Sequence, residues 1–141
     1  MIIGFTGTRR GMTPAQRAAL ADCVSALPAR AIHGGATGAD EEFDAFLISA
    51  GMNPQDIDVY PASVDRWLKW TDAGRTTYAV DEPLLRNRII ARRCDYLIAA
   101  PATAGEVVRS GTWATIRYAR RPIARRPIVI LLPEGGVREE R

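Results

Sequence analysis

The sequence predicts an α/β protein in which a doubly wound, parallel, five-stranded sheet carries helices on both faces. Strand-like apolar runs alternate with helical segments over nearly the whole chain, and small glycine turns follow several of the runs. A strand that returns parallel to its neighbour needs a crossover, and a helix is the usual one. With 141 residues and 47% apolar content, the chain is large enough to bury one core, so we expect a single domain over residues 1–133.

The expected strands are short apolar runs bounded by turn residues, at residues 2–6, 29–33, 57–60, 96–100 and 128–132. Helices are expected over about residues 13–28, 39–51, 81–90 and 111–121. The first helix has the clearest start, because Thr13 can cap it, Pro14 fits its first turn and Gln16 can close a capping box. Pro28 stops this helix.

Two segments do not fit the strand and helix pattern. Residues 62–82 carry Trp67, Trp70 and Tyr78 without a helical or strand period, which predicts a partly ordered excursion. A long loop in a compact domain is usually functional or mobile, and the alternative is a short helix that packs both tryptophans on the body. Residues 134–141 form a polar tail that we expect to be disordered.

Composition excludes several classes of protein. The net charge of +3 is too small to indicate a nucleic-acid partner by itself. Cys23, Cys94 and the single His33 make neither a disulfide framework nor a zinc set, so no metal and no required cofactor are expected. The apolar runs are far shorter than the roughly 20 residues of a membrane span, and Met1 opens a strand-like run without the basic region of a signal peptide. We therefore expect a cytoplasmic protein with no membrane contact.

The turn at Ser110, Gly111 and Thr112 is the main candidate for binding an anion. It lies between a strand and a helix, where free backbone N–H groups and the helix dipole favour negative charge. No Asp or Glu occurs from Val107 to Pro133, and Arg109 immediately precedes the turn. The alternative is an ordinary strand-to-helix turn with Ser110 as its N-cap.

A second glycine turn, with Gly34, Gly35, Thr37 and Gly38, leads into a helix with the opposite charge. Acidic residues crowd the first turn of that helix, at positions 40, 41, 42 and 44, where they complement the dipole and repel phosphate. Asp40 could instead accept hydrogen bonds from ribose hydroxyls. The alternative is that these carboxylates only stabilise the helix.

Further candidates lie at the same end of the predicted sheet. Arg86, Asn87 and Arg88 lie in the early part of the third helix, and the two arginines are about 200° apart around it, so at most one of them can enter the crevice; we favour Arg86 with Asn87. The first turn adds the rim residues Gly7, Thr8 and Arg9. His33 is expected to be a strand-end residue and not a catalyst.

These motifs resemble the SLOG superfamily of Rossmann-like nucleotide-binding proteins, and most of all its small stand-alone members of the YspA type. The resemblance rests on four motifs in order: residues 4–9, 33–40, 86–90 and 110–112, with Tyr60-Pro61-Ala62 between the second and the third. It implies a nucleotide ligand in a crevice at the carboxyl ends of the strands and a homodimer or higher homo-oligomer. The residues expected to bind are Gly7, Thr8, Arg9, Gly34, Gly35, Thr37, Gly38, Asp40, Arg86, Asn87, Arg88, Arg109, Ser110, Gly111 and Thr112.

Two relatives imply alternative functions. The LOG phosphoribohydrolases, which cleave the N-glycosidic bond of nucleoside 5′-monophosphates, carry a glutamate three residues after the threonine of their glycine motif. Thr115 stands there in this chain, and such cleavage needs a carboxylate near the sugar, so only Asp40 or Glu106 could serve. We therefore expect binding without fast turnover.

The DprA/Smf core is similar to residues 83–90 and 110–112, and this resemblance implies single-stranded DNA binding. Such binding calls for a basic groove with stacking aromatic side chains. Arg66, Trp67, Trp70 and Arg75 could supply part of one. We treat single-stranded nucleic acid as the less favoured partner.

Overall fold

The computed structural model describes all 141 residues and has the predicted α/β architecture. Five strands confirm the predicted ones, namely β1 (Ile2–Gly7), β2 (Arg30–His33), β3 (Ile57–Val59), β5 (Tyr96–Ala100) and β6 (Ile128–Leu131). They pair in parallel in the order β3-β2-β1-β5-β6. The strand order therefore reverses between β1 and β5, which is where ligands bind in doubly wound sheets.

Two further strands widen the sheet to seven. Strand β4 (Thr76–Thr77) pairs in parallel with β3, and β7 (Val137–Glu140) pairs antiparallel with β6. The expected disorder of residues 134–141 is therefore wrong. Gly135, with a positive φ of 103°, turns the chain back along the open edge of β6, and this pairing satisfies backbone groups that would otherwise face solvent.

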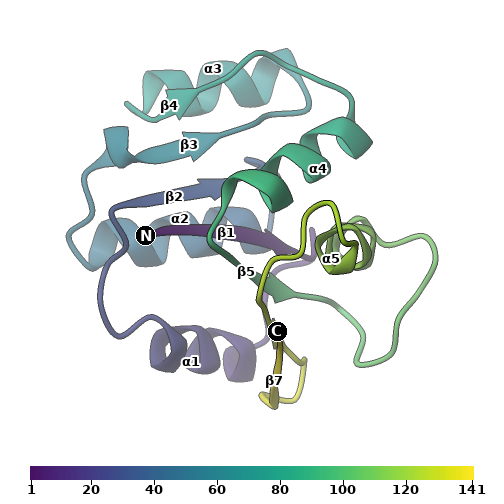
Figure 1. Cartoon of the computed structure of the whole chain (residues 1–141). Coiled ribbons are helices and arrows are strands. Elements are labelled where there is room, and N and C mark those ends of the chain that lie inside the picture. Colours follow the sequence, from purple (N-terminus) through teal and green to yellow (C-terminus); the bar gives the residue numbers. More distant parts are fainter.

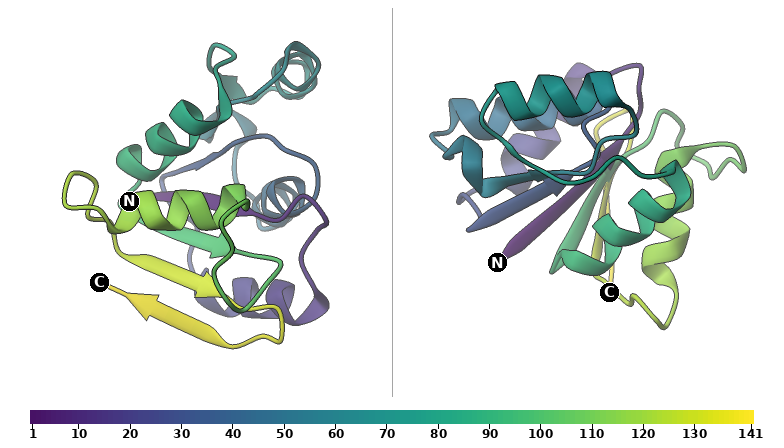
Figure 2. Two further views of the ribbon diagram at one scale, coloured as in Figure 1. Left: turned by 90° about the vertical axis from the view of Figure 1, so that its right-hand side faces the viewer. Right: turned by 90° about the horizontal axis from the view of Figure 1, so that it is seen from above.

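Helices cover both faces of the sheet (Figure 1). The first face carries α1 (Pro14–Cys23) and α2 (Ala39–Ser49), and the second carries α4 (Pro83–Arg93) and α5 (Gly111–Arg120). The view from above in Figure 2 shows the strands between these two layers. Each layer buries its own apolar cluster, with Phe43 and Leu47 in the first and Ile90 and Trp113 in the second.

Strand β5 shows why both faces are covered. Leu97 and Ala99 belong to the cluster under α4 and α5, whereas Ile98 and Ala100 belong to the cluster under α1 and α2. Side chains alternate across a strand, so a strand with four buried apolar residues in a row must be covered on both sides.

The first helix forms as predicted at its start and ends earlier than predicted. Thr13 accepts a hydrogen bond from the Gln16 backbone N–H, and the Gln16 side chain accepts one from the Thr13 N–H, which is the predicted capping box. The helix ends at Cys23 and Leu27 is exposed. Pro28 offers no N–H and disfavours helical backbone at the residue before it, so the last turn before it cannot close.

The segment 62–82 contains a helix, so the alternative to the excursion is the correct one. Ser63 caps α3 (Val64–Asp72) by accepting from the Arg66 backbone N–H. Trp70 is only 4% exposed and joins the core under α2, while Trp67 is half-buried. Val64, Trp67 and Leu68 have the three- and four-residue spacing of a helix, so the expectation that this segment has no helical period is wrong.

Candidate functional site

The main cleft of the molecule lies where the strand order reverses. Its volume is about 530 Å³, and it is bounded by the loops that follow β1, β2 and β5 and by the first turns of α4 and α5. Eleven of the residues predicted to bind a ligand line this cleft: Gly7, Thr8, Arg9, Gly34, Asp40, Arg86, Asn87, Arg109, Ser110, Gly111 and Thr112.

The first turn of α5 presents backbone donors to the cleft. Ser110 is the N-cap, and its hydroxyl accepts from the Trp113 N–H at 3.1 Å. The N–H groups of Gly111 and Thr112 have no acceptor within the chain, and Gly111 is exposed. The N-cap alternative for Ser110 is thus correct and compatible with an anion site, because the cap satisfies only one of the free donors of the turn.

Arginine dominates the charge around the cleft. Arg9, Arg10, Arg86 and Arg109 line it, and Asp40 is its one acidic residue. Arg9, Arg10 and Arg109 are exposed and form no ion pair with any carboxylate of the chain. Guanidinium groups without a partner at the mouth of a cleft create a positive field that attracts anions.

Two buried polar residues, Arg86 and Asp40, line the cleft beside Gly34. Arg86 and Asp40 are each 6% exposed, and Arg86 donates from Nη1 to the carbonyl oxygens of Gly34 and Tyr60 at 2.9 and 3.4 Å. Asp40 accepts from the Ala36 N–H through Oδ2 at 3.2 Å. Arg86 Nε and Asp40 Oδ1 have no hydrogen-bond partner, which is costly for buried polar groups.

Burial shifts the pKa of both groups in the direction that favours the neutral form. Burial raises the pKa of Asp40, although the positive charge of Arg86 and the hydrogen bond from the Ala36 N–H act against it. Burial also lowers the pKa of Arg86, and the positive charge of Arg9 adds to this effect. Perturbed groups in a cleft are typical of functional sites.

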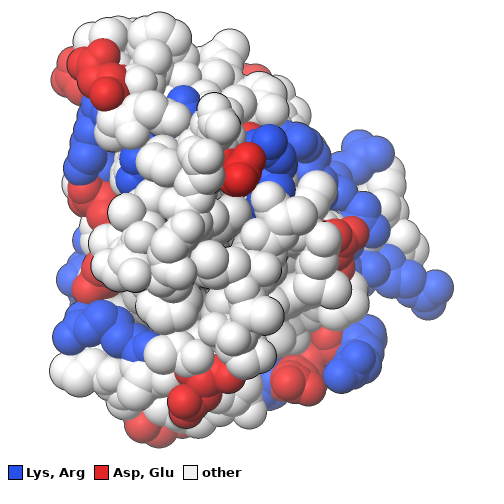
Figure 3. Space-filling view, turned by 90° about the vertical axis from the view of Figure 1, so that its left-hand side faces the viewer, with Lys and Arg blue, Asp and Glu red and all other residues white.

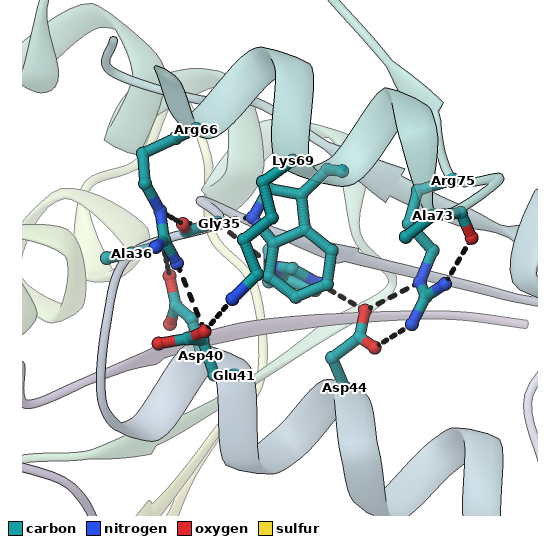
Figure 4. Close-up of polar contacts among 11 residues, drawn as sticks. Gly35, Ala36, Asp40, Glu41, Asp44, Arg66, Lys69, Ala73 and Arg75 are labelled. Carbon is teal, nitrogen blue, oxygen red and sulfur yellow. Dashed lines mark hydrogen bonds and ion pairs between the residues drawn. The ribbon is translucent and has the colours of Figure 1, made fainter.

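The other three carboxylates at the start of α2 turn away from the cleft. Glu41 pairs with Lys69 and Arg66, and the hydrogen bond from Lys69 is the main reason that its pKa is lowered. Glu42 accepts from the Met12 N–H and pairs with Arg17 at 2.9 Å. In Figure 4, Arg66, Lys69 and Arg75 reach from α3 and the turn after it to the carboxylates of α2.

Asp44 shows the contrast with Asp40 most clearly. It is 2% exposed and accepts from His33 Nε2 at 2.8 Å and from the Arg75 guanidinium. Burial alone would raise the pKa of Asp44, but the hydrogen bonds from His33 and Arg75 outweigh it and the pKa is lowered. His33 ends β2, and its Nδ1 accepts from the Gly35 N–H at 2.9 Å, so this pair holds the turn after β2 in place.

Close packing fixes the loops around the cleft. Gly38 has φ +84°, and a Cβ there would lie 2.3 Å from the Arg9 carbonyl oxygen; a Cβ on Gly7 would lie 2.4 Å from the Ala39 Cβ. The Ala39 N–H donates to the Thr8 carbonyl at 3.0 Å, and the Thr8 N–H donates to the Ala100 carbonyl. The loops after β1, β2 and β5 are therefore tied together through Thr8.

Four residues predicted to bind a ligand do not line the main cleft. Gly35 and Thr37 line a smaller adjoining cleft, and Gly38 packs against the loop after β1. Arg88 lies over the Tyr118 ring at 5.4 Å, which agrees with the prediction that only one of the two arginines enters. Glu106 also lies outside, in ion pairs with Arg117 and Arg120.

Several residues that line the cleft were not predicted from the sequence. Arg10 follows Arg9, which was predicted, and its position in the same turn could have identified it as a residue of the cleft. Ala36, Thr103 and Val107 also line the cleft, but small and apolar loop residues carry no chemical pattern that could be recognised in one sequence.

The two ends of the sheet differ in charge. The arginine-lined cleft lies at the carboxyl ends of the strands. Figure 3 shows the opposite end, where charged side chains lie around the edge of a broad uncharged area. No helix is long and apolar enough to cross a membrane, and no three His, Cys, Asp or Glu side chains are placed together as a metal site would need.

The fold and the site define an α/β protein with a Rossmann-like doubly wound sheet and a basic cleft at its switch point. In comparisons with known proteins, no family model, no curated protein and no solved structure matches the chain.

Proposed function

We propose that the main cleft binds a phosphate-bearing nucleotide. The phosphate lies at the first turn of α5, against the N–H groups of Gly111 and Thr112 and the side chain of Arg109. The sugar lies toward Asp40, which accepts a hydrogen bond from a hydroxyl group.

The observation that carries this proposal is the charge of the cleft lining. Four arginines and one carboxylate line the cleft, and none of the four arginines forms an ion pair within the chain. An anion at this place gains charge-assisted hydrogen bonds from guanidinium groups and backbone N–H groups together. A neutral ligand would leave these charges uncompensated.

The buried residues of the cleft support a ligand that is polar at its other end. Asp40 and Arg86 line the cleft, and each has a buried polar atom without a hydrogen-bond partner; ribose hydroxyls can donate to a carboxylate, and ribose oxygens can accept from a guanidinium. The half-buried Asn87 stands next to the phosphate turn, with its Nδ2 4.0 Å from the place where a Cβ of Gly111 would be. A nucleotide that spans the cleft would meet each of these groups.

Titration calorimetry with AMP and adenosine tests the proposal. We expect AMP to bind at least tenfold more tightly than adenosine, and the difference to shrink as salt is raised, because charge-assisted contacts are screened. Arg109→Gln should remove most of the difference, whereas the control Arg88→Gln should leave it unchanged. Equal binding of AMP and adenosine, or no binding of either, would overturn the proposal.

A nucleotide N-glycosidase is the second candidate, and the position of Asp40 favours it. A buried carboxyl with a raised pKa in the sugar half of the cleft has the character of a general acid. Incubation with AMP, dAMP and NAD, followed by chromatography for free base or nicotinamide, tests this activity. Product release that is lost in Asp40→Asn would establish it, and no release above the buffer control would exclude it.

A further inference from the structure

A second, smaller cleft adjoins the main one. It has a volume of about 250 Å³ and lies between the turn after β2 and the start of α3. Arg9, Gly34, Ala36 and Arg86 line both clefts. The two clefts are therefore neighbours that share part of their lining.

The smaller cleft carries positive charge only. Arg9, Arg66 and Arg86 line it, and no carboxylate does. Glu41 lies behind Arg66 at 3.4 Å, and that carboxylate is also paired with Lys69. The lining of this cleft thus has the same electrostatic character as the phosphate end of the main cleft.

Arg86 supplies an observation that is independent of this charge count. It is 6% exposed, it lines both clefts, and its Nε has no hydrogen-bond partner. A buried guanidinium with an unsatisfied N–H is costly unless an acceptor reaches it. Because Arg86 lines both clefts, an anionic ligand beside its guanidinium would offset the cost of burying this charge.

Contacts between α3 and α2 hold the wall of the smaller cleft in place. The Gly35 carbonyl accepts from Arg66 Nε at 2.7 Å and from Trp70 Nε1 at 3.0 Å, and Arg66 leads from α3 toward this turn in Figure 4. Arg66 is thereby oriented before any ligand arrives, and such preorganisation lowers the entropic cost of binding. The α3 segment therefore does more than cover the core.

We propose that the smaller cleft is a second anion subsite, so that the ligand class is a nucleotide with two phosphate groups, one held at α5 and one held by Arg66 and Arg9. This inference rests on the proposed nucleotide binding of the main cleft and specifies its ligand. The second phosphate can be attached to the first or carried elsewhere on the nucleoside.

Calorimetry with AMP, ADP and adenosine 3′,5′-bisphosphate tests the inference. We expect at least one of the doubly phosphorylated nucleotides to bind about tenfold more tightly than AMP. The better of the two shows whether the second phosphate is attached to the first or to the ribose. Arg66→Gln should remove this gain and leave the AMP affinity within about twofold, and Arg66→Lys should keep part of the gain.

The outcomes separate the two proposals. If AMP binds and neither second phosphate improves its affinity, or if Arg66→Gln weakens AMP as much as the doubly phosphorylated ligand, the second subsite is wrong and the nucleotide site stands. If none of these ligands binds, both proposals fail. Melting temperatures of the Arg66 variants, with Arg88→Gln as a matched control, identify any loss that comes from the contacts to Gly35.

Discussion

The first turns of α2 and α5 are built from similar parts and serve opposite purposes. Both follow parallel strands and both open with small residues, but α2 has Asp40, Glu41 and Glu42 in its first turn and α5 has no acidic residue there. In α2 the carboxylates complement the dipole from within and bind neighbouring elements. In α5 only Ser110 caps the helix, so the N–H groups of Gly111 and Thr112 stay free. A helix start becomes an anion site when the chain leaves its donors unsatisfied.

The largest expected effect is a loss of unfolding free energy when the close packing of the turn before α2 is disturbed. Gly38→Ala would place a Cβ 2.3 Å from a backbone oxygen in a conformation, φ +84° and ψ −122°, that side chains avoid. We expect a loss of about 3–5 kcal/mol of unfolding free energy from strain and overpacking together, measured by urea denaturation. Gly105→Ala is the matched control, because a Cβ there meets nothing within 4 Å. A loss below about 1 kcal/mol would show that this turn can open.

The second prediction concerns the carboxylates of α2 that bind other side chains, in contrast to Asp40, which lines the cleft. Asp44→Asn removes charge from a buried group bound to His33 and Arg75, and should cost about 2–3 kcal/mol at pH 7. The folded-state pKa of Asp44 lies below the unfolded value, so its stabilisation is present above about pH 4 and is lost as the pH falls through the folded-state pKa. Denaturation curves from pH 3 to 7 would show this. The exposed Asp22→Asn should change little.

Asp40→Asn should raise the stability of the protein at pH 7, whereas Asp44→Asn should lower it. Burial raises the folded-state pKa of Asp40 above the unfolded value, so the carboxyl favours folding below about pH 4 and this contribution is lost as the pH rises. Asn keeps the shape without the charge, so the variant should be more stable than the wild type at pH 7 and equal to it near pH 3. A variant that is less stable at pH 7 would contradict the view that Asp40 is kept for ligand binding at a cost in stability.

The sequence was sufficient to predict five of the seven strands and the position of the cleft. The alternation of strands and helices places the loops after β1, β2 and β5 together, whatever the sequences of the loops. The absence of acidic residues near Ser110 can be read directly from the sequence. What could not be predicted depends on three-dimensional pairing. Asp44 binds His33 and Arg75, which lie 11 and 31 residues away in the sequence. Nothing in the local sequence distinguishes the carboxylate of Asp44 from that of Asp40.

Two other elements show the same limit. Strand β7 forms because the edge of β6 offers unpaired backbone groups, and its own sequence is as polar as a disordered tail. Helix α3 has apolar residues at helical spacing, but Val64 and Leu68 are exposed and only Trp70 anchors the helix in the core, so its apolar residues alone do not predict how it packs. Both elements form because of their contacts with the rest of the fold, and the contacts of α3 also determine the position of Arg66.

The most direct test of the comparison deletes one free donor of α5. Gly111 is the first residue of the helix, where proline fits, and Ser110 has an extended backbone with φ −111° and ψ 124° that is compatible with a following proline. Gly111→Pro removes the N–H, and Gly111→Ala keeps it. We predict that Gly111→Pro weakens AMP binding about fivefold, close to 1 kcal/mol, with adenosine binding unchanged and Gly111→Ala like the wild type. Equal AMP affinity of the proline and alanine variants at equal stability, or no AMP binding by the wild type, would contradict the account.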